Sequence, residues 1–261
     1  MKRNLQFFVL ALLMSSTAAV CQNGSASFDG NDFIEVPEIT AVTGANARTV
    51  EAWIKVPLES NSEQVLVQWG VDDAGTKWTI RLNAGSVLRV EHGSGATFGS
   101  TALNDDAWHH VAVALAESAP LSEAKLYVDG VEETYGQQAG AACNTGSHVI
   151  WIGKANTKVS DGDKPIPVRH WIGLMDELRI WNVARTVEEI AALKDSSICP
   201  SQHEGLLAAY RFNETDGVTA ADLSGNFDGL LGGNADSTNL MPTWTDTGAP
   251  VDETDCGSDV G

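Results

Sequence analysis

The sequence predicts an all-β fold, an antiparallel sandwich of two sheets with one short helix near residues 187–194. Short runs rich in aliphatic, β-branched and aromatic residues follow one another, and Gly, Asp and Asn separate them. No long stretch with helical periodicity intervenes, which favours an antiparallel sandwich over a parallel βαβ sheet. The strands expected before the helix are residues 33–36, 49–56, 65–69, 78–82, 87–91, 109–115, 125–135, 149–153 and 173–181.

Residues 125–135 are expected to form a β-hairpin. Lys-Leu-Tyr-Val precedes Asp129-Gly130, and Val-Glu-Glu-Thr follows this pair. An Asp-Gly pair supplies the two positive φ angles that a type I′ turn requires, and this turn matches the twist of the strands that it joins. The sequence therefore predicts a two-residue turn at Asp129 and Gly130.

The run at residues 173–181 combines a strand pattern with acidic residues at its centre. Side chains alternate between the two faces of a strand, so Asp176 is expected to share a face with Leu178. Met175 and Glu177 are expected on the other face. The adjacent carboxylates of Asp176 and Glu177 should therefore point to opposite sides of the sheet.

A helix start follows this strand. Thr186 stands three residues before Glu189. This is the spacing of a capping box, in which each side chain satisfies a backbone N–H at the helix N-terminus. We therefore expect a short helix over residues 187–194.

Residues 1–21 have the pattern of a secretory signal peptide. Two basic residues precede a short, largely apolar stretch over residues 5–14, and small residues follow it. The stretch is shorter than the about 20 residues of a membrane-spanning helix, so we expect a secreted chain without a membrane span. The periplasm or the cell surface is the alternative location. A lipidated Cys21 is the rival interpretation, but Val20 suits lipidation poorly, so cleavage near Gln22 is favoured.

The chain is strongly acidic, with a formal net charge of −19. Without residues 1–21, 14 Lys and Arg stand against 35 Asp and Glu, a formal charge of −21. Such a surface repels phosphate backbones, which excludes nucleic acid as a partner. The acidity either serves solubility alone or includes carboxylates that bind a divalent cation.

Three cysteines remain after residue 21, at positions 143, 199 and 256. Disulfides form outside the cytoplasm, so one pair and one free thiol are expected. Cys199 with Cys256 is the favoured pair because it brackets the C-terminal segment, and closing that loop contributes about 4 kcal/mol in the chain-entropy model. Pairing of Cys143 with Cys199 stays open. The cysteines form no Cys-x-x-Cys motif, which argues against a structural zinc site.

Five segments carry a family resemblance. They are Phe-Asp-Gly-Asn-Asp-Phe-Ile-Glu-Val-Pro at 28–37, Val-Glu-Ala-Trp-Ile-Lys at 50–55, Trp-His-His-Val-Ala at 108–112, Gly-Leu-Met-Asp-Glu-Leu-Arg-Ile-Trp-Asn at 173–182, and Tyr-Arg-Phe-Asn at 210–213 followed by Asp-Leu-Ser-Gly-Asn at 222–226. Together they resemble the laminin G-like jelly roll domains of secreted bacterial proteins, in the concanavalin A-like lectin/glucanase superfamily. Met175 replaces the usual aliphatic residue. The resemblance implies a jelly roll sandwich, which hosts lectins, adhesion modules, glycanases and spacers.

The order of the segments departs from this family, in which the Tyr-x-Phe-Asn strand and the Asp-x-Ser-Gly-Asn loop usually precede the Phe-Asp-Gly strand. Here they come last, within residues 206–233. This segment either folds back to supply a strand or opens an incomplete second domain. About 60 residues after Cys199 bury too little core to fold alone, so the first alternative is favoured. We expect one domain over residues 22–247 closed by segment 206–233, and a flexible acidic tail over 248–261.

The loop at residues 222–226 is the candidate metal site. Asp222 and Asn226 place two oxygen side chains around a glycine, and calcium prefers such ligands. In the resembling family this loop often belongs to a calcium site, which here is expected to be structural. Calcium takes six to eight oxygens, so Asp29 and Asp176 are the further candidate ligands. The alternative is an Asx-turn, in which Asp222 bonds only its own backbone.

No catalytic residue is assigned. Laminarinase-like enzymes of this sandwich carry Glu-x-Asp-x-x-Glu along one strand, which places nucleophile and acid/base about 5 Å apart. Here Glu214-Thr-Asp216 and Glu253-Thr-Asp255 lack a third partner and lie in polar loop or tail sequence. The sequence therefore favours binding over bond cleavage.

The eight tryptophans invite a sugar-stacking interpretation, because indole faces pack against pyranose rings. Strand positions are mostly core positions. The tryptophans expected in the core are Trp53, Trp108 and Trp181. The tryptophans near loops, which are the candidates for an exposed platform, are Trp69, Trp78 and Trp244.

Two further clusters are assigned structural roles. Glu51 and Arg179 are expected to form a partly buried ion pair between strands, because buried charges are usually paired. His109 and His110 follow Trp108, as at a structural strand entry of the resembling family. No Ser or Cys nucleophile pattern accompanies these histidines.

The function favoured is a secreted, non-catalytic binding or adhesion module for extracellular glycan or protein. A glycan-active hydrolase or lyase with an unrecognised site is the first alternative. A structural spacer is the second.

Overall fold

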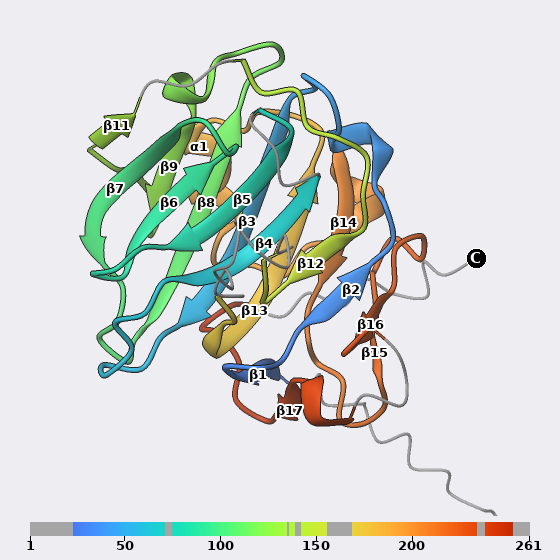
Figure 1. Ribbon diagram of the computed structural model, residues 1–261. Coiled ribbons are helices and arrows are strands. Elements are labelled where there is room, and N and C mark those ends of the chain that lie inside the picture. The colour runs from blue at the N-terminus through green and yellow to red at the C-terminus, as the bar shows by residue number, and fades with distance from the viewer. Residues whose placement is uncertain are drawn as a thin grey trace, which may run out of the picture.

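Two antiparallel β-sheets lie face to face in the computed structural model (Figure 1). The structure describes residues 23–70, 75–134, 136–138, 142–155, 169–233 and 238–252. The predicted signal peptide at residues 1–21 lies outside these ranges. Within them, one sheet has eight strands and the other has nine, which confirms the predicted jelly roll sandwich.

The eight-stranded sheet has the order β10-β9-β8-β3-β13-β1-β17, and β14 also pairs with β13. Along one edge, β13 pairs first with β1 and then with β14, while β3 occupies its other edge. The strands of this sheet are β1 (Ser25–Asp29), β3 (Arg48–Lys55), β8 (Trp108–Leu115), β9 (Lys125–Val128), β10 (Val131–Glu132), β13 (Ile172–Trp181), β14 (Leu206–Tyr210) and β17 (Thr243–Thr245).

The nine-stranded sheet has the order β11-β7-β6-β5-β4-β12-β2-β16-β15. Its strands are β2 (Ile34–Val36), β4 (Gln64–Gly70), β5 (Lys77–Leu82), β6 (Val87–Glu91), β7 (Ala96–Ala102), β11 (Gly136–Gln138), β12 (Ile150–Ile152), β15 (Thr219–Ala220) and β16 (Gly229–Leu231). Sequence analysis missed β7, in which Ala, Gly and Ser interrupt the strand-favouring Thr and Phe residues. Short 3-10 helices are formed by Thr40–Val42, Leu121–Glu123, Pro200–Gln202 and Thr238–Leu240.

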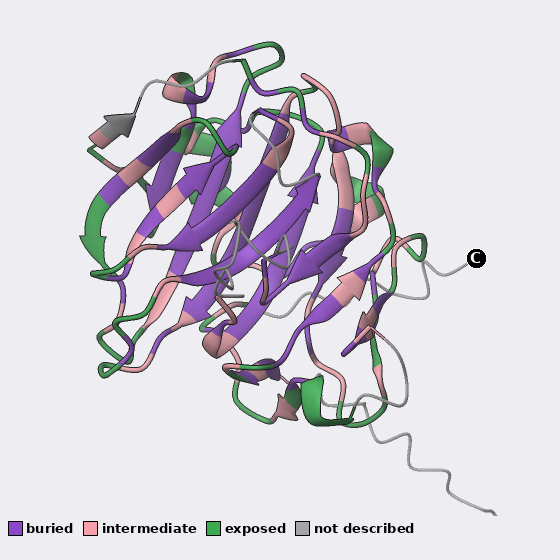
Figure 2. Cartoon of the chain, viewed as in Figure 1, coloured by how far each residue is buried: buried purple, intermediate pink, exposed green. Residues whose placement is uncertain are grey.

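The core lies between the sheets, where buried residues cover most of the strands (Figure 2). Ile54 and Val111 enter it from the eight-stranded sheet, and Ile80 and Ile152 enter it from the other. The alternation of side chains along each strand places every second residue in this core. None of the helices in the described part of the chain is long and apolar enough to cross a membrane.

The predicted hairpin is confirmed. Asp129 and Gly130 have φ angles of 52° and 79°, as a type I′ turn requires. Val131 pairs with Val128, so the two residues between them form the whole turn. The predicted strand 125–135 is thus two short strands, β9 and β10.

A β-bulge in β13 overturns the predicted alternation of side chains. Asp176 lies opposite Trp53 and Arg179 lies opposite Glu51, so three steps along β13 match two along β3. Glu177 adopts a φ of 47°, which absorbs the extra residue. Asp176 and Glu177 therefore both lie on the outer side of the sheet, instead of on opposite faces.

Met175 and Leu178 consequently both face the core, where each is fully buried. Two residues of different parity along a regular strand point to opposite faces. The extra residue in the bulge shifts the alternation of side chains by one position. The apolar residues on both sides of the acidic pair therefore reach the same core.

The short helix α1 (Val187–Leu193) is confirmed, together with its capping box. Thr186 accepts the backbone N–H of Glu189, whose side chain accepts the backbone N–H of Thr186. The helix covers the outer face of the eight-stranded sheet. Ile190 packs there on small residues of β8, Ala112 and Ala114, which allow a close approach.

The C-terminal segment contributes strands to both sheets. β14 pairs with β13 and β17 pairs with β1, while β16 pairs with β2 in the opposite sheet. Tyr210 and Phe212 are buried in the core between the sheets. Segment 206–233 thus folds back onto the N-terminal half, although the domain boundaries 22–247 stay a prediction.

Two residues of the predicted flexible tail, Ala249 and Asp252, are held in the fold. Ala249 is fully buried, and its backbone N–H donates to the Asp176 carboxylate over 2.7 Å. Asp252 forms a parallel bridge with Ser196. The acidic composition of this segment did not reveal these contacts, because they are made with residues far away in the chain. Residues 253–261 lie outside the described ranges.

Cys143 is a buried free thiol. Cys199 is also buried, while Cys256 lies outside the described residues. The bridge between Ser196 and Asp252 brings the two chain segments together just before these cysteines. The Cys199–Cys256 disulfide therefore stays a prediction, and the geometry around it is consistent with it.

Candidate functional site

The Asp222 carboxylate organises its own loop. Its Oδ1 accepts the backbone N–H groups of Ala209 and Ser224, at 2.9 Å and 3.1 Å. Its Oδ2 accepts those of Asn226 and Phe227, at 3.3 Å and 3.1 Å. These bonds fasten the loop to β14 and use the lone pairs that a metal ion would need.

The four predicted calcium ligands do not converge. Asp29 lies opposite Ile172, which is four residues before Asp176, so the two aspartates are about 13 Å apart along the sheet. The Oδ2 of Asp176 accepts from Ala249, and the amide of Asn226 turns back to Ser224. Within the described residues, no group of three or more His, Cys, Asp or Glu side chains is placed to hold a metal.

Calcium binding stays a prediction, and thermal melting tests it. Calcium that binds only the folded chain raises the Tm by mass action. If the Asp222 loop accepts an ion, the Tm at millimolar calcium should exceed the Tm in EDTA, and Asp222→Asn should abolish the difference. Equal melting temperatures would leave Asp222 with the loop-organising role that its hydrogen bonds define.

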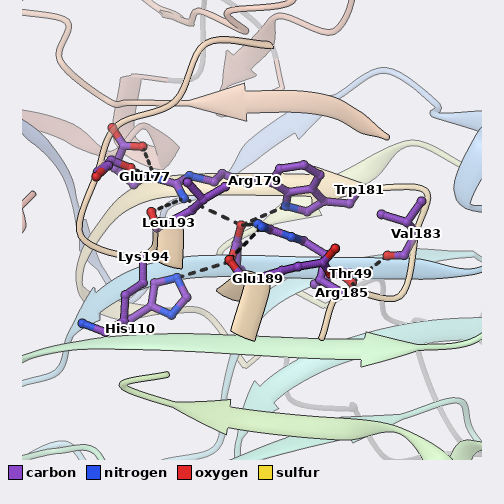
Figure 3. A network of polar contacts seen from close by, with 12 residues as sticks. Thr49, His110, Glu177, Arg179, Trp181, Val183, Arg185, Glu189, Leu193 and Lys194 are labelled. Atoms are coloured by element: carbon purple, nitrogen blue, oxygen red, sulfur yellow. Dashed lines mark hydrogen bonds and ion pairs between the residues drawn. The ribbon is translucent and has the colours of Figure 1, made fainter. Parts of the chain in front are cut away.

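A buried polar network joins α1 to the outer face of the eight-stranded sheet (Figure 3). Glu51 on β3 is fully buried, and its Oε1 accepts from Trp181 over 2.9 Å and from Arg185 over 3.0 Å. Arg179 lies 3.7 Å from the same oxygen. The predicted Glu51–Arg179 pair thus exists, within a larger and completely buried cluster.

The arginines also bind the carbonyl groups at the end of α1. The Nη1 of Arg179 donates to the carbonyl of Leu193, and its Nη2 donates both to the carbonyl of Ser196 and, over 2.9 Å, to Glu177. The last carbonyls of a helix have no partner within the helix, so these bonds satisfy them. The network is closed to solvent, and its role is to hold the helix on the sheet.

His110 completes this network from β8. Its Nε2 lies 3.5 Å from the Oε2 of Glu51, and its ring packs edge-on against Trp53. Burial lowers the pKa of His110 to about 4, although the Glu51 carboxylate opposes this shift. The imidazole ring is therefore neutral at pH 7, and the arginines supply the positive charge that faces Glu51.

Two of the three tryptophans named as candidates for a surface platform lie in the core. Trp69 and Trp78 are 1% and 0% exposed, with ring centroids 5.9 Å apart. The guanidinium of Arg48 lies over both rings, at 6.0 Å and 5.3 Å. Both residues lie near loops in the sequence, but β4 and β5 direct their indole rings into the core.

Trp244 is the platform candidate that reaches the surface. It lies on β17 with intermediate exposure and stacks on Phe212, with ring centroids 6.3 Å apart. Phe212 in turn stacks on the buried Tyr210. A rigid aromatic column thus holds the indole at the end of the sandwich.

A pocket of about 280 Å³ opens beside this indole. It combines one aromatic side chain with two carboxylates and two hydroxyls, which suit the apolar faces and the hydroxyl groups of a sugar. The lining residues are Glu214, Thr215, Trp244, Thr245 and Asp246.

Glu214 has an unusual environment in this pocket. Its Oε1 accepts the backbone N–H of Ala221 over 2.6 Å, while its buried Oε2 has no hydrogen-bond partner among the described residues. Burial raises the pKa of the Glu214 carboxyl, and the bond from Ala221 only partly offsets this. A carboxylate oxygen without a partner is costly when buried, so a ligand hydroxyl that reaches it would relieve that cost.

The sequence matches one family model. Residues 28–191 match the concanavalin A-like lectin/glucanases superfamily. The match spans β2 to α1 and most of the C-terminal segment lies beyond it. No curated protein matches the chain.

Several solved structures align with the chain, and the first of those named here shares its fold. A candidate carbohydrate-binding protein of Bacteroides ovatus aligns with a TM-score of 0.63 and 21% identity, over 89% of this chain and 62% of that chain. Domains LG4-5 of the mouse laminin α1 chain align with a TM-score of 0.47 and 14% identity, over 64% and 44%. A heptameric SAP-like pentraxin of Limulus polyphemus aligns with a TM-score of 0.47 and 16% identity, over 70% and 85%. The chain thus spans less than two thirds of the first two.

Proposed function

Because the chain belongs to the concanavalin A-like lectin/glucanases superfamily, we propose that it is a secreted, non-catalytic module that binds extracellular glycan. The observation that carries this proposal is the Trp244 pocket, where an indole held by stacked aromatic rings stands beside carboxylates and hydroxyls. Sugar recognition needs both an apolar surface for the ring and acceptors for its hydroxyls.

Two observations support this proposal from outside the pocket. The Bacteroides ovatus protein that shares the fold is a candidate carbohydrate-binding protein. The formal charge of −19 opposes nucleic acid as a ligand. A protein ligand is the alternative partner, and an adhesion role would follow from either.

Glycan-array binding followed by calorimetry tests the proposal. We expect Trp244→Ala to weaken glycan binding by about tenfold or more, because the lost aromatic contact is worth about 1.5 kcal/mol. Trp108→Ala is the matched control, since Trp108 is also half-buried but does not line the pocket. Equal losses in both variants, or capture of a protein and no glycan, would contradict the proposal.

Glycan hydrolysis is the second candidate function, and one observation favours it. Glu214 and Asp246 line the same pocket, and burial raises the pKa of Glu214 as a general acid requires. Released reducing sugar in the same binding assays, lost in Glu214→Gln, would establish the enzyme. Binding by the native chain without release would support the module.

A further inference from the structure

A second cavity lies apart from the Trp244 pocket and shares no residue with it. It has a volume of about 390 Å³ and lies where the chain leaves β1, enters β4 and enters β13. This volume is in the range of small-molecule sites. The lining residues are Gly30, Ser62, Glu63, Arg169, His170 and Ile172.

Arg169 presents hydrogen-bond donors to this cavity. Its Nε donates to the Oε2 of Glu63 over 2.6 Å, which fixes the plane of the guanidinium. Its two terminal nitrogens have no hydrogen-bond partner among the described residues. Two parallel N–H donors in a fixed plane match the two oxygens of a carboxylate.

Glu63 is shared between two arginines. Its other oxygen lies 2.8 Å from Arg81, which is also paired with Glu91 at 3.1 Å. Burial raises the pKa of Glu63, but the two arginines outweigh it and hold that pKa below its usual range. Glu63 binds only the Nε edge of Arg169, so the far edge of this guanidinium keeps its donors for a ligand.

The backbone at Arg169 is strained, with a φ of 54°. This left-handed conformation is costly for a side chain larger than glycine, and such strain clusters at functional sites. Glycine would fit the backbone better. The backbone alone would favour glycine here, so we attribute the arginine at this position to a role of its side chain.

Two neighbouring side chains add polar atoms. Gln64 is fully buried and accepts the backbone N–H of Ile172, but its Nε2 donor has no partner among the described residues. The Nδ1 of His170 lies 3.2 Å from the carbonyl of Asp32, which assigns its proton to that nitrogen. The Nε2 of His170 is then an acceptor. The Asp32 carboxylate binds the backbone N–H of Asp29 and does not line the cavity.

We propose that this cavity is a second ligand site, which binds the carboxylate of a sugar acid through Arg169. The terminal nitrogens of Arg169 donate to the carboxylate, and Ser62 and His170 bind ring hydroxyls. Ile172 and Gly30 supply the apolar wall for the ring. The site is independent of the Trp244 pocket, so either proposal can fail without the other.

Calorimetry of the full chain with sodium glucuronate, glucose and sodium acetate tests this site. We expect saturable binding of glucuronate, weaker binding of acetate and no binding of glucose. Glucuronate that binds no better than glucose would overturn the proposal. Acetate that binds as tightly as glucuronate would overturn the part that concerns the sugar ring.

Two variants locate the binding. Arg169→Gly removes the guanidinium and relieves the φ of 54°, so we expect it to melt no lower than the native chain and to lose glucuronate binding at least tenfold. Arg89→Gln is the control, because Arg89 is another half-buried arginine paired with a glutamate and does not line the cavity. Trp244→Ala should retain glucuronate binding. Unchanged binding in Arg169→Gly would assign the ligand to another place and overturn the proposal.

Discussion

Removal of all residues after Cys199 is expected to leave the chain unfolded at 25 °C, without a cooperative melting transition. The truncation deletes β14, β15, β16 and β17, and thus uncovers an edge of β13, β1 and β2. Tyr210 and Phe212 leave the core, and each buried aromatic contributes about 2–3 kcal/mol. Further burial by the small and aliphatic residues of this segment is lost as well, against a total stability of about 5–15 kcal/mol for a typical domain.

The measurement is a thermal melt by near-ultraviolet circular dichroism. Cys256→Ser in the full chain is the control, because it retains every strand and removes only the predicted disulfide. We expect this control to keep a cooperative transition at a lower Tm, since the disulfide is worth about 4 kcal/mol in the chain-entropy model. A truncated chain that melts like the full chain would refute closure by the C-terminal segment.

Glu51→Ala is expected to destabilise the protein by about 3–5 kcal/mol, because it leaves the arginines of a buried cluster without their shared carboxylate. Arg185 and Trp181 lose a hydrogen bond to the same oxygen, and Arg179 loses its closest partner on β3. In a chain of this size such a loss lowers the Tm by about 10 °C. Chemical denaturation measures the change in the free energy of unfolding.

Glu132→Ala is the matched control for this substitution. Glu132 is also ion-paired, with Lys125 at 2.7 Å, but both side chains are solvent-exposed. An exposed pair contributes about 0–1 kcal/mol, so the control should change stability little. Equal effects of the two substitutions would show that burial does not set the energy of the Glu51 cluster.

Local signals in the sequence predicted the local structure well. The turn at Asp129 and Gly130 and the capping box of Thr186 and Glu189 formed as expected. Both depend on residues that are neighbours in the chain, so no distant contact is needed to specify them. The paired charges of Glu51 and Arg179 were also foreseen, because adjacent strands of a sheet need partners for buried charges.

Features that depend on long-range contacts were not foreseen. The bulge at Glu177 places Asp176 and Glu177 on one side of the sheet, where regular alternation separates them. Trp69 and Trp78 were candidates for an exposed platform and lie in the core. A register shift and the choice of face are set by the partner strands, which a single sequence does not display.

The candidate sites divide in the same way. Trp244 was identified as a candidate because an indole is a distinctive side chain, but Glu214 and Asp246 were joined to it only by the returning segment. Arg169 and His170 gave no signal in the sequence, because their partners, Glu63 and the carbonyl of Asp32, lie 106 and 138 residues earlier. Proximity across such distances is a property of the folded chain.

The sequence by itself determined the all-β class, the hairpin turn, the helix start and the acidic charge, because each follows from composition or from residues a few positions apart. The tertiary structure alone decided which tryptophan reaches the surface, where the acidic pair of β13 points and which polar groups line the two cavities. The physical reason is that burial and cavity geometry depend on how the two sheets and the returning segment pack, which involves residues far apart in the chain.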